Sequence, residues 1–191
     1  MSKEPKHYDI EEAFRNSDKL IEEMKKGKIF LYPTDTVYGI GCDASNPECV
    51  KKIYEIKKRK EDKPLSVIAP NEEWILNNFK ISKPVLRLYL PGPYTLLVEK
   101  KDPAFLRHLS PNNRLGIRIP EHSFTLLVMK AGIPFVTTSA NLSGKEAPSS
   151  LEEVEEEIVK KVDYVIEGPC FLGKPSTLVE IDENIKEIKR S

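Results

Sequence analysis

The apolar positions of this chain fall either in short continuous runs or in longer stretches with helical spacing. Runs rich in β-branched and aromatic residues predict strands over residues 28–32, 65–69, 94–99, 115–119, 133–137, 163–167, 176–181 and 185–189. Apolar residues three and four positions apart predict helices over residues 9–26, 47–56, 72–79, 82–90, 120–132 and 151–161. Because helices and strands alternate and the last strands follow one another as in hairpins, we expect an α/β fold with a mixed sheet.

Length and charge narrow the class of protein. The chain has 191 residues with no internal repeat and no linker longer than a loop, so we expect a single domain over residues 1–191. Its 30 Lys and Arg residues balance 30 Asp and Glu residues, which argues against a globally basic nucleic-acid-binding protein but leaves room for a local basic groove. No apolar run reaches the length of a membrane span, and no signal-peptide core is present. We therefore expect a cytoplasmic protein without membrane association, with its three cysteines as reduced thiols.

The stretch IFLYPTDTVYGIG, residues 29–41, is the first candidate site. A short apolar strand ends at Pro33 because proline cannot donate to a sheet ladder, and a loop rich in hydroxyl groups follows. In α/β proteins such loops at the carboxyl ends of strands present groups to ligands. An ordinary strand and turn would give the same pattern, so the loop gains weight only from similar loops elsewhere in the chain.

Several other polar segments lie at strand ends or in loops. They are the basic run 57–63, Arg114 with Arg118, the loop 137–141, Ser176 with Thr177, and Arg190 at the end of the last strand. A basic run is by itself more often a solvated face than a site. Arg118 differs because it interrupts the apolar strand LGIRIP, where a charge needs a partner or a ligand. The planar guanidinium suits a carboxylate or a phosphate.

The absence of common motifs narrows the chemistry. The sequence contains no P-loop, no GxGxxG after a strand, no GxSxG elbow, and no histidines at metal-ligand spacing. The polar segments offer cations, hydroxyls and amides but few nucleophiles or general bases. Such a site works by positioning and charge stabilisation, as phosphoryl or nucleotidyl transfer requires.

A resemblance covers nearly the whole chain, from about residue 10 to 190. The segments PTDTVYGIG, KKR with KPLSV, PGPYTLLV, LGIRIPEH, TTSANLSG and KPSTLVEID occur in this order. In this combination the chain resembles the YrdC-type threonylcarbamoyl-AMP synthase family. The resemblance implies a twisted mixed sheet flanked by helices with a large open groove. It also implies that L-threonine, bicarbonate or CO2, and ATP react to L-threonylcarbamoyl-AMP and pyrophosphate, for the threonylcarbamoyladenosine modification of tRNA. Because the chain ends at Ser191, we expect the short form, without the extra C-terminal domain of longer members.

The resemblance also implies roles for individual residues. The implied contacts to L-threonine are Thr36, Arg118, Thr137 and Ser176, with Arg118 holding the carboxylate. The implied contacts to ATP are Arg59, Lys63, Arg114, Ser139, Asn141, Ala147 and Arg190. Lys57 and Arg59 are the implied catalytic residues, which neutralise charge on the phosphates. Mg2+ is expected to accompany ATP, without a metal site built by the protein.

Two positions depart from the family pattern: Ile68 lies where some members carry a histidine, and Ala147 where some carry a serine. The pairs Lys57-x-Arg59 and Ser139-x-Asn141 are intact, which favours the synthase over a related branch that lacks them. The implied partners are a tRNA-modifying transferase that uses the product and, weakly, RNA. The alternative is a protein of the same fold that binds RNA or a nucleotide without synthase activity. The composition of residues 144–150 suggests a lid.

Overall fold

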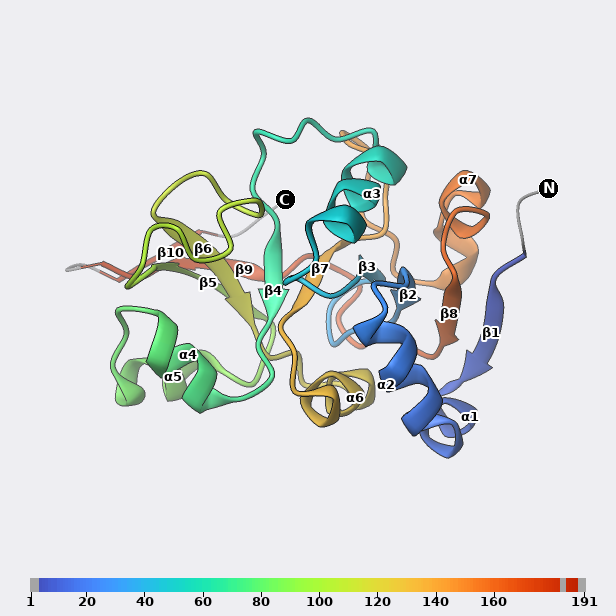
Figure 1. The fold of residues 1–191 in the computed structure, drawn as a ribbon, viewed down its shortest axis with the longest axis horizontal. Coiled ribbons are helices and arrows are strands. Elements are labelled where there is room, and N and C mark those ends of the chain that lie inside the picture. The colour runs from blue at the N-terminus through green and yellow to red at the C-terminus, as the bar shows by residue number, and fades with distance from the viewer. Residues whose placement is uncertain (1–3, 183–184, 189–191) are drawn as a thin grey trace.

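The computed structural model describes residues 4–182 and 185–188, and within these ranges a ten-stranded mixed sheet is flanked by helices (Figure 1). Its strands are β1 (Lys6–Asp9), β2 (Phe30–Tyr32), β3 (Gly39–Gly41), β4 (Ser66–Ile68), β5 (Tyr94–Glu99), β6 (Arg114–Arg118), β7 (Phe135–Ser139), β8 (Tyr164–Glu167), β9 (Thr177–Glu180) and β10 (Lys186–Ile188). They lie in the order β1-β8-β2-β3-β7-β4-β6-β5-β9-β10. Neighbours pair in parallel at β1–β8, β8–β2, β4–β6 and β5–β9 and antiparallel elsewhere, which confirms the predicted α/β class with a mixed sheet.

The helices are α1 (Ile10–Arg15), α2 (Ser17–Lys25), α3 (Pro47–Lys57), α4 (Glu72–Asn78), α5 (Lys83–Tyr89), α6 (Ser123–Ala131) and α7 (Glu156–Val159), with a 3-10 turn at Leu151–Glu153. Helix α3 begins as its sequence predicts. The Asn46 side chain accepts hydrogen bonds from the backbone N–H groups of Glu48 and Cys49, and Pro47 occupies the first turn.

Two predicted helices and two strands differ from expectation. The helix predicted over 9–26 begins one residue later, at a capping box formed by Asp9 and Glu12, and is divided at Asn16. The helix predicted over 151–161 is likewise divided, into a 3-10 turn and α7. Strand β1 was not predicted because it is a largely exposed polar edge strand, and β3 because two glycines flank a single apolar residue.

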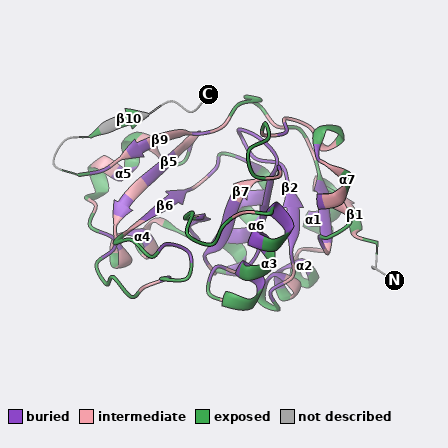
Figure 2. Ribbon diagram, turned by 90° about the horizontal axis from the view of Figure 1, so that it is seen from above, coloured by how far each residue is buried: buried purple, intermediate pink, exposed green. Residues whose placement is uncertain are grey.

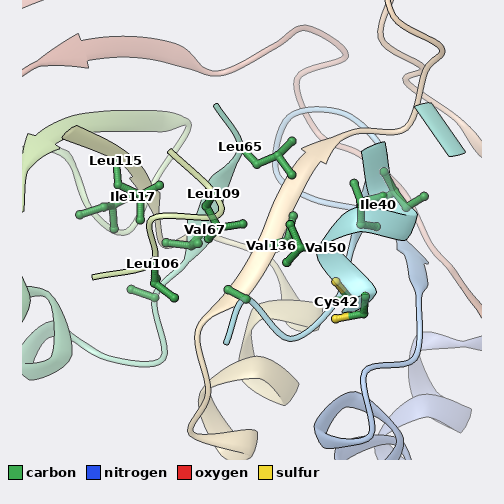
Figure 3. Close-up of a cluster of buried hydrophobic side chains, with 14 of the residues drawn as sticks. Ile40, Cys42, Val50, Leu65, Val67, Leu106, Leu109, Leu115, Ile117 and Val136 are labelled. Carbon is green, nitrogen blue, oxygen red and sulfur yellow. The ribbon is translucent and has the colours of Figure 1, made fainter. Parts of the chain in front are cut away.

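The sheet buries both of its faces. Successive residues of β2 point to opposite sides, so Phe30 and Tyr32 pack with α1, α2 and α6, while Leu31 packs in the cluster that contains α3. Figure 2 shows the buried strands at the centre and the exposed faces of the helices outside. Figure 3 shows part of the larger cluster, in which Val50 of α3 lies near Ile40 of β3 and Val136 of β7. Within the described part of the chain, no helix is both long and apolar enough to cross a membrane.

Candidate functional site

A groove of about 310 Å³ opens on the sheet face that carries α6. Helix α6 covers this face over Ile68 and Phe135, which belong to its cluster. Two positions away on the same face, Ser66 of β4 pairs with Thr137 of β7. Helix α6 does not cover this pair, and both residues line the groove. Thr95 and Leu178 extend this open floor across β5 and β9. The groove therefore lies where the sheet continues beyond the helix that packs on it.

Arg118, at the end of β6, is the only arginine or lysine buried within the floor of the groove among the described residues that line it. Its Nη2 donates to Oδ1 of Asp35 at 2.8 Å and to the hydroxyl of Thr36 at 3.1 Å. Its Nε is buried and has no hydrogen-bond partner within the described chain. Burial lowers the pKa of Arg118, and the Asp35 carboxylate opposes that shift. Asp35 is thus the partner that the buried charge of Arg118 was expected to need, and the Nε donor still lacks a hydrogen bond to any described residue.

The hydroxyl-rich loop after β2 is held by its own side chains. The Thr34 hydroxyl donates to the carbonyl of Val37 at 2.7 Å and accepts from the N–H of Thr36 at 3.1 Å. The Tyr38 hydroxyl donates to the carbonyl of Gly168 at 2.7 Å, and the N–H of Tyr38 donates to the carbonyl of Pro148 at 2.8 Å. One of these bonds, to Pro148, ties the loop to residues 144–150, the predicted lid, so the loop is more than a simple turn between strands.

The other predicted threonine contacts lie close by. Thr137 and Ser176 are buried and line the same groove as Arg118. The Ser176 hydroxyl lies 2.6 Å from the hydroxyl of Thr95 across β5 and β9. Thr36 does not line the groove and instead supports Arg118 from behind. The structure therefore brings Arg118, Thr137 and Ser176 into one groove and places Thr36 against Arg118.

The Ser-x-Asn segment forms a second part of the site. Ser139 lines the groove, and its hydroxyl donates to Oδ1 of Asn141 at 2.5 Å. The Lys57 ammonium donates to the backbone carbonyls of Ser139 and Asn141, the latter at 2.8 Å. Burial lowers the pKa of Lys57 to about 7, with a smaller contribution from Arg59 in the same direction. Lys57 does not line the groove: it lies beneath the segment and holds it in place.

Arg59 lies at the rim of the groove, two residues beyond Lys57. Its Nη2 donates to the carbonyl of Pro64 at 2.9 Å, which folds the basic run back toward the groove. Lys63 and Ala147 are outside the groove lining, and Arg114 lies 3.6 Å from the Asp182 carboxylate at the far end of β6. Arg190 lies outside the described residues.

Asp35, Thr95 and Ser66 were not among the predicted site residues, although Thr95 and Ser66 line the groove and Asp35 holds Arg118. For Asp35 a signal was present: one acidic residue in a loop of hydroxyls and one arginine in an apolar strand each need a partner. No group of three or more His, Cys, Asp or Glu side chains in the described residues is arranged to hold a metal ion.

These features define the class of protein. It is an α/β protein with a mixed sheet, whose groove is lined by the buried guanidinium of Arg118, by hydroxyl side chains and by Arg59. The chain belongs to the Sua5/YciO/YrdC family, because the family model described as "Telomere recombination" matches residues 22–191.

Curated relatives come from several lineages. A protein of Methanocaldococcus jannaschii, named as a candidate threonylcarbamoyl-AMP synthase, is 38% identical over 94% of this chain and 87% of its own length. The threonylcarbamoyl-AMP synthase of Bacillus subtilis is 33% identical over 87% of this chain and 50% of its own length. The mouse threonylcarbamoyl-AMP synthase is 36% identical over 84% of this chain and 61% of its own length. The chain thus spans half to two thirds of the length of the last two.

Solved structures share the fold. Sua5 of P. abyssi complexed with L-threonine matches with a TM-score of 0.84 and 25% identity, over 97% of this chain and 56% of that one. YciO of E. coli matches with a TM-score of 0.80 and 25% identity, over 99% of this chain and 95% of that one. These neighbours confirm the YrdC-like fold that the sequence motifs imply.

Proposed function

We propose that this chain is an L-threonylcarbamoyladenylate synthase, which converts L-threonine, bicarbonate or CO2, and ATP to L-threonylcarbamoyl-AMP and pyrophosphate. The observation that carries the proposal is the joint presence, in one groove, of the buried Arg118 guanidinium and the Ser139-x-Asn141 segment on Lys57. Relatives from Bacillus subtilis and mouse are named threonylcarbamoyl-AMP synthases, and a Sua5 neighbour was solved with L-threonine.

The amino acid is assigned to the Arg118 end of the groove. Arg118 lines this groove, and its guanidinium offers the substrate carboxylate charge-assisted hydrogen bonds. The hydroxyl of Ser176 and the backbone of Thr137 lie in the same groove and supply neutral contacts. Thr36 acts indirectly, because its hydroxyl is already bonded to Arg118.

The nucleotide is assigned to the end of the groove formed by Arg59 and Ser139. Arg59 stabilises negative charge on the phosphates, while Asn141, Lys63, Arg114, Ala147 and Arg190 complete the nucleotide side. Lys57 contributes its positive charge from beneath the segment, through the carbonyls that it holds. No carboxylate lines the groove in the described residues, so Mg2+ is held by phosphate oxygens and water when it accompanies ATP.

The reaction needs positioning more than acid–base groups. The amine nitrogen of threonine forms a bond to the carbon of CO2 and loses a proton, which gives a carbamate. A carbamate oxygen then bonds to the α-phosphorus of ATP, the bond to the β-phosphate oxygen breaks, and pyrophosphate leaves. The groove holds the two substrates side by side and neutralises charge on the departing phosphates.

The product is assigned to a tRNA-modifying transferase that attaches the threonylcarbamoyl group to adenosine. Lys58, Lys60 and Lys63 are exposed and provide weak electrostatic attraction for RNA. The described part of the chain shows no membrane-spanning helix, which is compatible with a role in the cytoplasm.

The test is pyrophosphate release from ATP, measured with and without L-threonine and with and without bicarbonate. Release that depends on all three, with threonylcarbamoyl-AMP identified by mass spectrometry, is the expected result. ATP binding without release would favour the alternative, a nucleotide- or RNA-binding protein of the same fold. RNA binding that falls steeply with salt and needs no threonine would favour the same alternative.

A further inference from the structure

The carboxylate of Asp35 joins two segments of the site, one through each oxygen. Oδ1 accepts from Nη2 of Arg118 at 2.8 Å, and Oδ2 accepts from the backbone N–H of Glu121 at 3.0 Å. The backbone carbonyl of Asp35 accepts from the N–H of Leu172 at 3.1 Å, in the loop that leads to Ser176. One residue therefore connects the end of β6, the start of the connection to α6, and the loop before β9.

Arg118 depends on these contacts for its orientation. Its guanidinium is planar, so the two acceptors at Nη2, Asp35 and Thr36, fix the plane of the whole group. Once that plane is fixed, the directions of the remaining N–H donors, among them the unpartnered Nε, are fixed as well. A long side chain without such contacts would sample several rotamers, and a ligand carboxylate would have to order it on binding.

Because Arg118 is buried, its positive charge needs the carboxylate of Asp35 as a partner. The side chains of Arg118 and Asp35 are only 8% and 6% exposed. Removing one partner of a buried ion pair leaves an uncompensated charge, which drives the other partner toward solvent or another acceptor. The direction of the Arg118 donors is thus set by Asp35 rather than by the apolar strand that carries the arginine.

We infer that Asp35 is a positioning residue for substrate binding: its carboxylate holds the Arg118 guanidinium in the orientation that receives the carboxylate of the amino-acid substrate. This inference rests on the proposed function. Asp35 does not line the groove, and each of its oxygens already accepts one hydrogen bond, so we assign it no direct contact with the substrate. Its effect passes through Arg118.

The test compares Asp35→Asn with the matched control Glu121→Gln. An amide can accept from only one of the two donors that the carboxylate serves, whereas the exposed Glu121 side chain has no contact with Arg118 in the described structure. For Asp35→Asn, KM for L-threonine is expected to rise about tenfold or more, the effect of one charge-assisted hydrogen bond, with kcat and KM for ATP changed less than about threefold. Glu121→Gln is expected to keep both KM values.

A merely structural role would give a different result. Partial unfolding reduces the concentration of active enzyme, so apparent kcat falls while KM for threonine stays at the wild-type value. That outcome overturns the inference and leaves the proposed function standing. A wild-type protein that neither binds L-threonine in calorimetry nor releases pyrophosphate with it overturns the proposed function and the inference together.

A second variant keeps the test decisive if Asp35→Asn fails to fold. The double variant Asp35→Asn with Arg118→Gln removes both charges and leaves no unpaired buried ion. If Asp35 acts through Arg118, kcat/KM for threonine in the double variant equals that of Arg118→Gln alone. A further loss of about tenfold in the double variant shows that Asp35 acts independently of Arg118, which overturns the inference.

Discussion

The ammonium of Lys57, at the end of α3, donates to both the backbone and the side-chain oxygen of Asn141, at 2.8 and 3.4 Å. It also donates to the carbonyl of Ser139. The Ser-x-Asn segment, of which Ser139 lines the groove, is therefore held from behind by the buried Lys57 side chain. The Lys-x-Arg motif combines two functions, because Lys57 supports this segment while Arg59 faces the groove.

We predict that Lys57→Met lowers both stability and activity. The change leaves two buried carbonyls without their donor, each at a cost of about 1–3 kcal/mol, offset in part by the removal of a buried charge. Thermal unfolding and pyrophosphate release measure the two effects. Lys58→Met is the matched control, because Lys58 is exposed and its ion pair with Glu157 contributes less than about 1 kcal/mol. Equal unfolding temperatures for the two variants would contradict the prediction.

Arg59→Ala is expected to lower activity without lowering stability. Arg59 is partly exposed at the groove rim, and water can replace its hydrogen bonds to the carbonyls of Pro64 and Lys63. A charge-assisted contact to phosphate is worth about 1.5–3 kcal/mol, so kcat/KM for ATP should fall about 10- to 100-fold. Lys60→Ala, an exposed change in the same run, serves as the control. Wild-type turnover by Arg59→Ala would remove the basic run from the nucleotide side.

Ser176→Ala is expected to weaken threonine binding by a smaller amount. The hydroxyl of Ser176 is buried in the groove beside that of Thr95, and its loss removes a neutral contact worth about 0.5–1.5 kcal/mol. KM for L-threonine should therefore rise about two- to tenfold, while KM for ATP stays constant. The exposed Ser143 provides a Ser→Ala control outside the groove. The assignment of Ser176 fails if KM for ATP rises and KM for threonine does not.

His122 makes stability depend on pH. Burial lowers its pKa from the usual 6.5, and this effect outweighs the Pro169 carbonyl, 3.1 Å from Nε2, and the Asp35 charge, which both raise the pKa. Below about pH 6.5 the unfolded chain then binds more protons than the folded chain. The stability that neutral His122 contributes is therefore fully present above about pH 6.5 and is lost as the pH falls. His122→Asn keeps a side-chain cap without a titrating group. Chemical unfolding between pH 7 and 5 should show a steeper loss for the wild type, and parallel curves would refute the prediction.

Gly41→Ala is expected to prevent proper folding. A Cβ atom at Gly41 would collide with the backbone carbonyl of Val136 and would lie 3.0 Å from both the Phe135 ring and the Tyr32 hydroxyl. Backbone atoms of two paired strands cannot move apart without breaking the sheet, so the cost should exceed about 3 kcal/mol. Ser45→Ala, an exposed change just beyond the same strand, should alter stability by less than about 0.5 kcal/mol. Circular dichroism and thermal unfolding measure both.

Local patterns predicted most of the elements. The strand predicted over 94–99 coincides with β5, and the helix predicted to follow Asn46 begins at Pro47. Both depend on features within a few residues, namely a run of β-forming residues in the first case and a cap in the second. The elements that the pattern missed depend on distant partners. Strand β1 exists because it pairs with β8, and β3 because its glycines allow β7 to approach closely.

The sequence by itself determined the family, the α/β class and the order of the motifs, because these follow from residue types and their spacing along the chain. It also indicated that Arg118 needs a partner, since a charge inside an apolar strand cannot remain unpaired. Only the tertiary structure decided that this partner is Asp35 and that Lys57 lies beneath the Ser139-x-Asn141 segment rather than in the groove. These contacts join residues 83 and 84 positions apart, and nothing in the local sequence specifies which distant groups the packed sheet brings together.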